Sequence, residues 1–305
     1  MKKIHLLLPP CLIVLSAAPV FALPDYEPFS NATGSGGTAY TVGSNLAGQT
    51  DAGGQSWFTA GTGTVQPTIA AGDLTISGLA SSGGGESAAF GGNGNNARIN
   101  LSVGAGGITT GTVYFSFAMK ITDLTGLTTG GQFFFGFNNT QGSQTTVPNT
   151  VVSRVEMRSA GAGLYNIGLQ EGSTGTIGNL AWGSQTFTTS DTVLVVGSYT
   201  FNPSTGDDVS QLWINPSSTT FGAASAPTAT LTSSGGTDIA RIASAVIYDR
   251  GSGEAAAGLM DDLRFGTNWS DVTPAVGVVP EPTTITLSVL GLAGLCLRGA
   301  LRRKR

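Results

Sequence analysis

Carboxylates and tryptophans are the side chains that could support chemistry between Leu23 and Pro280. The single histidine, His5, and both cysteines, Cys11 and Cys296, lie near the ends of the 305-residue chain. Ser–His and Cys–His catalysis, the usual zinc ligand sets and disulfides are therefore excluded from the intervening region. The chemistry that remains is a pair of carboxylates, oxygen ligands for a cation, or aromatic rings that stack on a sugar.

A catalytic carboxylate pair is not predicted. Glycoside hydrolysis needs two carboxylates about 5 Å apart in retaining enzymes and about 6.5–9.5 Å apart in inverting enzymes. Glu156 is the one acidic residue in the predicted strand Arg154–Arg158, and Arg158 occupies the next position on its face. We therefore expect Glu156 to form a cross-strand charge pair on a solvated face, and we predict no catalytic residue.

Two acidic dipeptides offer oxygen ligands of the kind that Ca²⁺ binds. Asp207-Asp208 lies in a glycine-containing loop, where hairpin-turn chemistry is the favoured interpretation. Asp261-Asp262 begins a predicted strand, so one aspartate should face solvent while the other bonds nearby backbone or Arg264. Calcium ligation is the alternative at both dipeptides, and we predict no other cofactor.

The four tryptophans are candidates for stacking on a sugar. Burial or edge packing is the favoured interpretation for each of Trp57, Trp182, Trp213 and Trp269. Trp182 lies in a predicted loop, Leu180-Ala181-Trp182-Gly183, and is the candidate for glycan contact.

The last 26 residues have a tripartite pattern. Pro280-Glu281-Pro282 precedes an uncharged apolar run from Thr283 to Leu297, and the chain ends in the cations Arg298, Arg302, Arg303, Lys304 and Arg305. A helix over this run is about 22 Å long, which is short for a hydrocarbon core of about 30 Å. We predict a linker at 275–282, a transmembrane helix at 283–301 and a cytoplasmic tail at 302–305, because cations stay on the cytoplasmic side.

The N-terminus has the features of a secretory signal peptide at residues 1–22. Lys2 and Lys3 precede an apolar segment, and Val20-Phe21-Ala22 places small side chains where a signal peptidase requires them. We predict cleavage after Ala22 and export through the secretion translocase.

The C-terminal pattern resembles the PEP-CTERM sorting signal, whose partner is a membrane-embedded protease-transpeptidase called exosortase. The resemblance implies cleavage near Pro280-Glu281-Pro282 and transfer of the new C-terminus to the envelope or to exopolysaccharide. The two prolines keep this stretch extended, as a protease substrate must be. A plain membrane anchor that is never processed is the alternative.

Charge is distributed unevenly along the chain. Seven of the 14 cations and 17 of the 18 carboxylates lie between Leu23 and Pro280, which gives this region a net charge of −10, whereas the whole chain carries −4. Such an acidic region argues against nucleic acid and anionic lipid as partners. It is compatible with a soluble extracellular domain or with binding of divalent cations. The sorting signal implies that this domain is transiently anchored in the inner membrane and then moves to the cell surface or extracellular matrix.

Residues 23–274 are predicted to form an all-β domain. Alternating apolar residues mark strands at Thr112–Lys120 and Arg154–Arg158, and turn signals separate them from further candidates. These further candidates are Asp73–Ser77, Arg98–Val103, Gln132–Phe137, Leu164–Gln170, Thr192–Phe201, Val209–Asn215, Arg241–Tyr248 and Leu259–Phe265. Many short strands without a repeat indicate an antiparallel β-sandwich or jelly roll.

Three stretches resemble the concanavalin A-like (laminin-G-like) jelly-roll superfamily. They are Val193–Tyr199, Asp207–Pro216 with its Asp-rich hairpin and Asn-Pro ending, and Met260–Gly266 with its Asp-Asp-Leu-Arg core. The resemblance implies a jelly-roll fold for this region.

Together these observations predict an exported, non-catalytic surface or matrix protein with a structural or weakly glycan-associating domain. The alternatives are a dedicated lectin, with or without Ca²⁺, and a glycoside hydrolase or polysaccharide lyase.

Overall fold

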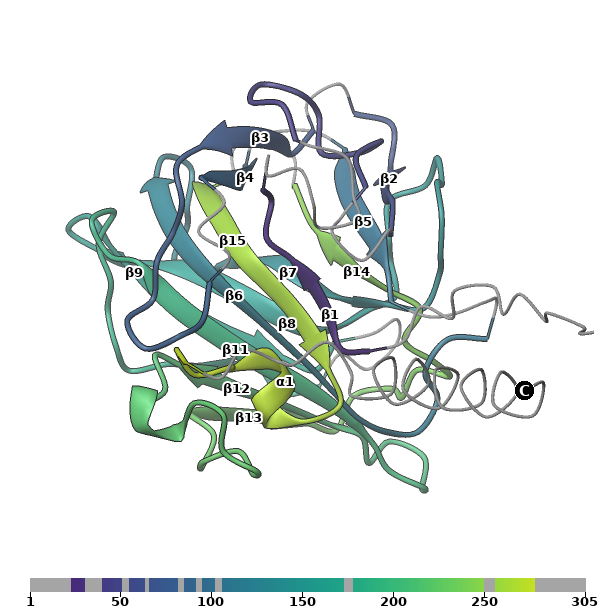
Figure 1. The fold of residues 1–305 in the computed structure, drawn as a ribbon. Helices are drawn as coiled ribbons and strands as arrows, with labels where there is room; N and C mark the ends of the chain where they lie inside the picture. The colour runs from purple at the N-terminus through teal and green to yellow at the C-terminus, as the bar shows by residue number, and fades with distance from the viewer. Residues whose placement is uncertain are drawn as a thin grey trace, which may run out of the picture.

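Alternating side chains on the long central strands build the interior of the molecule. The computed structural model describes residues 23–30, 40–50, 55–63, 66–81, 85–91, 95–101, 106–172, 178–249 and 256–277. Within them, Val113, Phe115, Phe117 and Met119 all turn toward the core from one face of a single strand. The result is two antiparallel sheets packed face to face (Figure 1).

The larger sheet has eight strands. In spatial order it contains β13 (Leu231–Ser234), β12 (Val209–Ile214), β11 (Val193–Phe201), β6 (Gly111–Asp123), β15 (Ala257–Gly266), β4 (Glu86–Phe90) and β3 (Thr68–Ala71). The eighth strand, β1 (Asp25–Glu27), pairs with β15 outside this path. The first strand of the chain therefore lies beside the last (Figure 1).

The smaller sheet has seven strands. In spatial order they are β10 (Ala181–Trp182), β9 (Leu164–Gln170), β8 (Val151–Gly161), β7 (Gln132–Asn138), β14 (Ser244–Ile247), β5 (Asn96–Asn100) and β2 (Trp57–Ala60).

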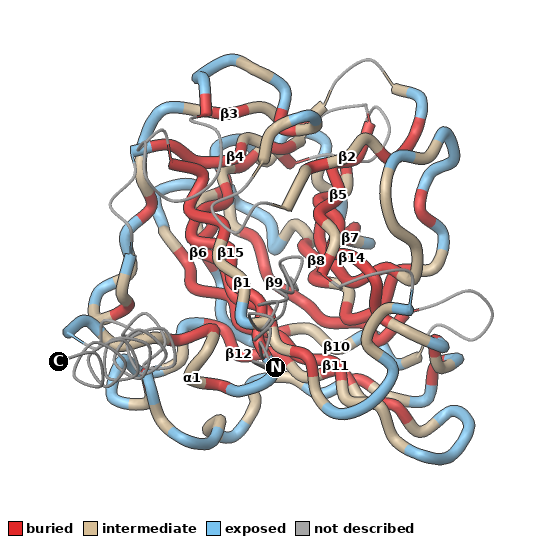
Figure 2. Tube along the Cα trace, turned by 45° about the vertical axis from the view of Figure 1, so that its right-hand side comes forward, coloured by how far each residue is buried: buried red, intermediate tan, exposed pale blue. Residues whose placement is uncertain are grey.

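Aromatic side chains from the two sheets meet in the core. Phe115 and Phe117 of β6 each lie 4.9 Å from Phe135 of β7 between ring centroids, and Phe115 meets Phe137 edge-on at 5.2 Å. Such pairs each add about 0.5–1.5 kcal/mol beyond the area they bury. Figure 2 shows buried residues concentrated along the strands and exposed residues along the outer loops.

A second apolar cluster covers the outer face of the eight-stranded sheet. Leu194 and Val196 of β11 point away from the main core and join Trp213, Trp269 and Val272. The short helix α1 (Trp269–Val272) brings the last two of these onto the sheet. The 3-10 helix η1 (Ser218–Thr220) precedes Phe221, which also belongs to this cluster.

The two-sheet antiparallel sandwich is confirmed, and β9 has the bounds that alternation predicts. The strand predicted at Asp73–Ser77 is wrong, because this stretch has no strand pairing. Trp182 was predicted in a loop but lies in β10. Strands β2, β3, β4 and β13 were not predicted.

Several predictions concern residues outside the described ranges. They include the signal peptide with Ala22, the Pro280-Glu281-Pro282 motif, the helix at 283–301 and the terminal cations. Among the residues that are described, no helix combines the length and the apolar character needed to cross a bilayer.

Candidate functional site

Trp182 lies on the outer face of the seven-stranded sheet, where glycines make room for its ring. It pairs with Gly168 of β9, and a Cβ atom at Gly168 would lie 2.5 Å from the indole. A Cβ atom at Gly131 would also lie 2.5 Å from it. The Arg158 guanidinium carbon sits 4.5 Å from the ring centroid, within cation–π range. The indole is therefore seated on backbone and in contact with a cation, and it is half-buried.

A second arginine–aromatic pair lies across the same face. The Arg154 guanidinium carbon lies 4.6 Å from the Phe133 ring centroid, and Phe133 lies 4.4 Å from Tyr248 between centroids. We call Trp182, Arg158, Phe133, Arg154 and Tyr248 the arginine–aromatic row. Aromatic rings and arginines with half-exposed members are the groups that stack on and hydrogen-bond to a polar ring ligand.

Glu156 lies within this row. It pairs with Gly168 on one side and Phe133 on the other, so it occupies the strand position between Trp182 and Phe133. The expectation that it lies on a solvated face is wrong, since only 6% of it is exposed. Glu156 lies between Gly168 and the buried Phe133 in the sheet, and alternation alone does not reveal this burial.

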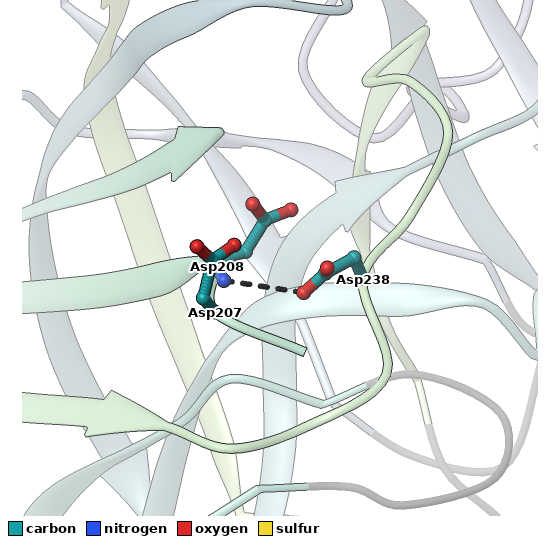
Figure 3. A group of neighbouring side chains, drawn as sticks. All are labelled: Asp207, Asp208 and Asp238. Atoms are coloured by element: carbon teal, nitrogen blue, oxygen red, sulfur yellow. Dashed lines mark hydrogen bonds between the residues drawn. The ribbon is translucent and has the colours of Figure 1, made fainter. Parts of the chain in front are cut away.

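The Asp207-Asp208 loop joins β11 to β12, and the structure adds Asp238 to it. Ligand atoms of the three carboxylates lie within 4.8 Å of one another (Figure 3). Asp238 accepts hydrogen bonds from the backbone of Gly206 at 2.5 Å and of Asp208 at 3.2 Å. The sequence did not indicate Asp238, because it follows β13 and is 30 residues from Asp208 in the chain.

Hydrogen bonds engage most oxygens of this aspartate cluster, Asp207, Asp208 and Asp238. Asp208 accepts from the Tyr199 hydroxyl at 2.6 Å and the Asn202 backbone at 2.7 Å, and Asp207 accepts from Ser204 at 3.2 Å. Asp207 Oδ1 is the one carboxylate oxygen of the cluster without a partner among the described residues. The cluster thus has the hydrogen bonding of a turn, and calcium ligation here stays an untested alternative.

Asp261 and Asp262 lie in the middle of β15, where its pairing with β6 is irregular. Both are buried, so the expectation that one faces solvent is wrong. Asp261 accepts a hydrogen bond from the Leu74 backbone at 2.7 Å, and burial raises its pKa to about 9. Its carboxyl group is therefore protonated at neutral pH, which disfavours it as a calcium ligand.

Asp262 belongs to a group that joins β1 to β15. It accepts a hydrogen bond from the Tyr26 hydroxyl and forms a buried ion pair with Arg264 at 3.4 Å. The Arg264 guanidinium carbon lies 4.2 Å from the Tyr26 ring centroid. The predicted bond between one aspartate and Arg264 is thus present.

Comparison with known proteins identifies the C-terminal pattern. A family model described as the PEP-CTERM protein-sorting motif matches residues 278–304. The chain therefore carries this sorting motif at its C-terminus, as the resemblance predicts. No curated protein matches the chain.

The solved structures that match this chain are distant in sequence and have TM-scores below 0.5. The binding domain of Paraclostridial Mosquitocidal Protein 1 is 12% identical, with a TM-score of 0.42 over 75% of this chain and 48% of that one. The receptor-binding domain of botulinum neurotoxin mosaic serotype C/D is 10% identical, with a TM-score of 0.39 over 78% and 49%. Lectin I-B4 from Griffonia simplicifolia is 10% identical, with a TM-score of 0.32 over 70% and 92%.

These matches concern architecture and carry no argument about activity. The chain spans about half the length of the toxin binding-domain chains that it matches. The concanavalin A-like assignment accordingly stays a resemblance, while the two-sheet sandwich stands on the strand pairing of the chain itself.

Proposed function

We propose that this chain is an exported, non-catalytic surface protein. Its sorting depends on residues 278–304, and its sandwich associates weakly with extracellular glycan or plays a structural role. The proposal that the chain is exported and sorted is supported by the motif at the C-terminus, together with the predicted signal peptide. The proposal that the sandwich associates with glycan is supported by one observation, the arginine–aromatic row around Trp182.

Processing at the motif is tested in cells that carry the matching exosortase. Changing Pro280, Glu281 and Pro282 together to alanine should leave the full-length form in the membrane fraction, because the extended protease substrate is lost. Release of this variant as efficiently as the parent protein would refute processing at the motif. Mass spectrometry of both ends of the mature protein would establish the two cleavage positions.

Glycan association is tested with the mature protein on a panel of neutral and uronate-containing polysaccharides. Trp182→Ala should weaken binding about tenfold, which corresponds to about 1.4 kcal/mol. Leu180→Ala is the matched control, because this exposed apolar side chain lies two residues away. Equal binding by both variants and the parent would exclude the row as the glycan contact.

The lectin alternative differs from a weakly associating domain in its saturation and sugar inhibition. If the aspartate cluster supports a calcium-dependent lectin, a chelator should abolish saturable binding. Chelator-resistant, unsaturable association is what we expect of the proposed domain.

An enzyme is the third candidate. Glu156 is isolated from a second carboxylate on its strand, and Glu171, which follows β9, is fully buried and accepts a hydrogen bond from the Gly236 backbone at 2.7 Å. We expect no release of reducing sugar from any polysaccharide of the panel. Release that disappears in Glu156→Gln or Glu171→Gln would overturn this part of the proposal.

A further inference from the structure

A cleft of about 800 Å³ lies where the two ends of the described chain meet. Its walls include Pro24 and Tyr26 from the beginning of the domain, Ser270 of α1, and Ala275, Val276 and Gly277 from the end. We call this cavity the end cleft. It is distinct from the arginine–aromatic row, which lies on the other sheet.

The last residues before the sorting motif are held on the body of the domain. The backbone of Val276 donates a hydrogen bond to Gly78 at 3.0 Å, and Ala275 forms a β-bridge with Leu79. The backbone of Ala80 donates to Pro274 at 2.8 Å. The position from which the sorting segment leaves the domain is therefore fixed beside the end cleft.

Chain length keeps the processing motif near this cleft. Gly277 lines the cleft, and the sorting motif begins at the next residue. Pro280 is three residues further on, so it lies at most about 11 Å from Gly277 at full extension. An enzyme that acts at Pro280-Glu281-Pro282 must therefore approach the cleft. The predicted cleavage site after Ala22 is only two residues from Pro24, another wall residue.

The walls of the end cleft have the character of an interface. Pro24, Pro274, Ala275 and Val276 supply apolar surface, and 68% of Val276 is exposed. Exposed apolar surface of this kind, rimmed by polar groups, marks sites of protein association. Asp25, Arg264 and Asp271 are the charged residues of its lining, and Arg264 among them is buried.

We propose that the end cleft is a docking surface for the membrane-embedded enzyme that processes residues 278–304. An apolar side chain of that enzyme fills the cleft while its active centre engages the Pro-Glu-Pro segment. This inference rests on the proposed function, because it assumes processing at that motif. Since β1, α1 and the final segment must all be folded to form the cleft, docking restricts processing to folded protein.

The first test uses the full chain in cells that carry the processing enzyme. Val276→Glu places a charge in the apolar wall and should slow conversion of the full-length form about tenfold, which is about 1.4 kcal/mol. Val147→Glu is the matched control, because Val147 is 50% exposed and does not line the cleft. Conversion of both variants at the parent rate would overturn the proposal.

Val276 is close to the motif, so a second variant acts from a different wall. Ser270→Phe narrows the cleft from α1, ten residues before Pro280, and should also slow conversion. If it converts at the parent rate while Val276→Glu is slow, the effect is local to the motif and docking at the cleft is refuted.

A third measurement does not depend on how a variant folds. Residues 278–305 are fused to an unrelated exported domain, which lacks the cleft. We expect conversion of this fusion to be about tenfold slower than that of the parent, and equal conversion would overturn the proposal.

The alanine variant of Pro280-Glu281-Pro282 separates this inference from the proposed function. If that variant is released like the parent, the proposed processing itself fails. If it is retained while the cleft variants convert normally, docking alone fails. The purified protein is also tested for binding to vesicles. If Val276→Glu abolishes this binding but leaves conversion unchanged, the cleft contacts lipid, and enzyme docking is refuted.

Discussion

The outer faces of the two sheets differ, although alternating strands build both. On the eight-stranded sheet the chain itself covers part of the outer face, since Trp269 and Val272 of α1 pack on Leu194, Val196 and Trp213. On the seven-stranded sheet the outer apolar cluster is small, with Phe133, Val151 and Val246. Half-exposed arginines and Trp182 extend beyond it.

Arginine–aromatic pairs occur on both sheets and show the same difference. Arg264 lies over Tyr26, but it is buried and also bonds Asp262 and the Ala80 carbonyl. Arg158 lies over Trp182 with both side chains half-exposed. The buried Arg264 guanidinium helps to fix strand β1 in place, whereas the pair of Arg158 and Trp182 is half-exposed and remains accessible to a ligand. The same residue types therefore hold a strand in place on one sheet and present a half-exposed pair on the other.

The largest expected effect follows from removing the covering tryptophan. Trp269 is 1% exposed, contacts Trp213 at 5.1 Å between ring centroids and donates its indole proton to the Thr220 carbonyl at 2.8 Å. Trp269→Ala should lower the free energy of unfolding by about 3–5 kcal/mol, as for large buried aromatics. Urea denaturation measures this loss.

Trp182→Ala is the counterpart on the other sheet. Its side chain is half-exposed, so the loss should be about 1 kcal/mol. If Trp182→Ala and Trp269→Ala lower the free energy of unfolding by similar amounts, the outer faces of both sheets contribute equally to stability. The difference between the covered face and the half-exposed face would then be refuted.

A pH-dependent loss of stability is expected from Asp261, a buried residue of β15 in the eight-stranded sheet. Burial raises the pKa of Asp261 from 3.8 to about 9, so the folded protein keeps a proton that the unfolded chain releases. This contribution is fully present below pH 3.8 and is lost as the pH rises through about 9. Between pH 7 and 9 the free energy of unfolding should fall by up to about 1.4 kcal/mol per pH unit on account of this group.

The pH range separates Asp261 from two other buried carboxyl groups, those of Glu27 and Asp249. Burial raises the pKa values of Glu27 and Asp249 to about 7, so their contributions fall mainly at lower pH. Asp261→Asn should flatten the profile above pH 7 in urea denaturation. Asp123→Asn is the control, because a hydrogen bond from Thr125 lowers the pKa of this exposed carboxyl group. An unchanged slope in Asp261→Asn would show that this proton is not retained.

Long strands with bulky alternating residues could be predicted from the sequence, whereas the four-residue strand β2 and the strands of small residues were missed. The stretch Leu164–Gln170 corresponds to β9 in both bounds. By contrast, β3 reads Thr-Ile-Ala-Ala and β4 reads Glu-Ser-Ala-Ala-Phe, and alanine has a low intrinsic preference for strands. These strands form because β15 provides a paired edge for β4, and β4 provides one for β3.

Candidate site residues were predicted only where the local sequence carried the signal. Asp207-Asp208 was correctly placed in a turn, because turn chemistry is local. Asp238 could not be predicted, since it reaches the turn through pairing of β12 with β13. The burial of Glu156 was also missed, because it depends on which rings the neighbouring strands bring to the same face.

Substitution of the glycine beside Trp182 tests how this ring is held on the outer face of the seven-stranded sheet. Gly168→Ala places a methyl group about where the indole now lies, since a Cβ atom there would be 2.5 Å from the ring. We expect a loss of about 1–3 kcal/mol in the free energy of unfolding, which is typical of added bulk at a packed position. Gly106→Ala is the control, because no atom lies within 4 Å of a Cβ at that position.

Fluorescence quenching shows whether the ring itself moves. Trp57, Trp213 and Trp269 are at most 2% exposed, so quenching by acrylamide reports mainly on Trp182. Gly168→Ala should increase this quenching, whereas Gly106→Ala should not. If the two variants behave alike, the glycine does not seat the indole, and the open face lacks the fixed aromatic platform on which the glycan proposal depends.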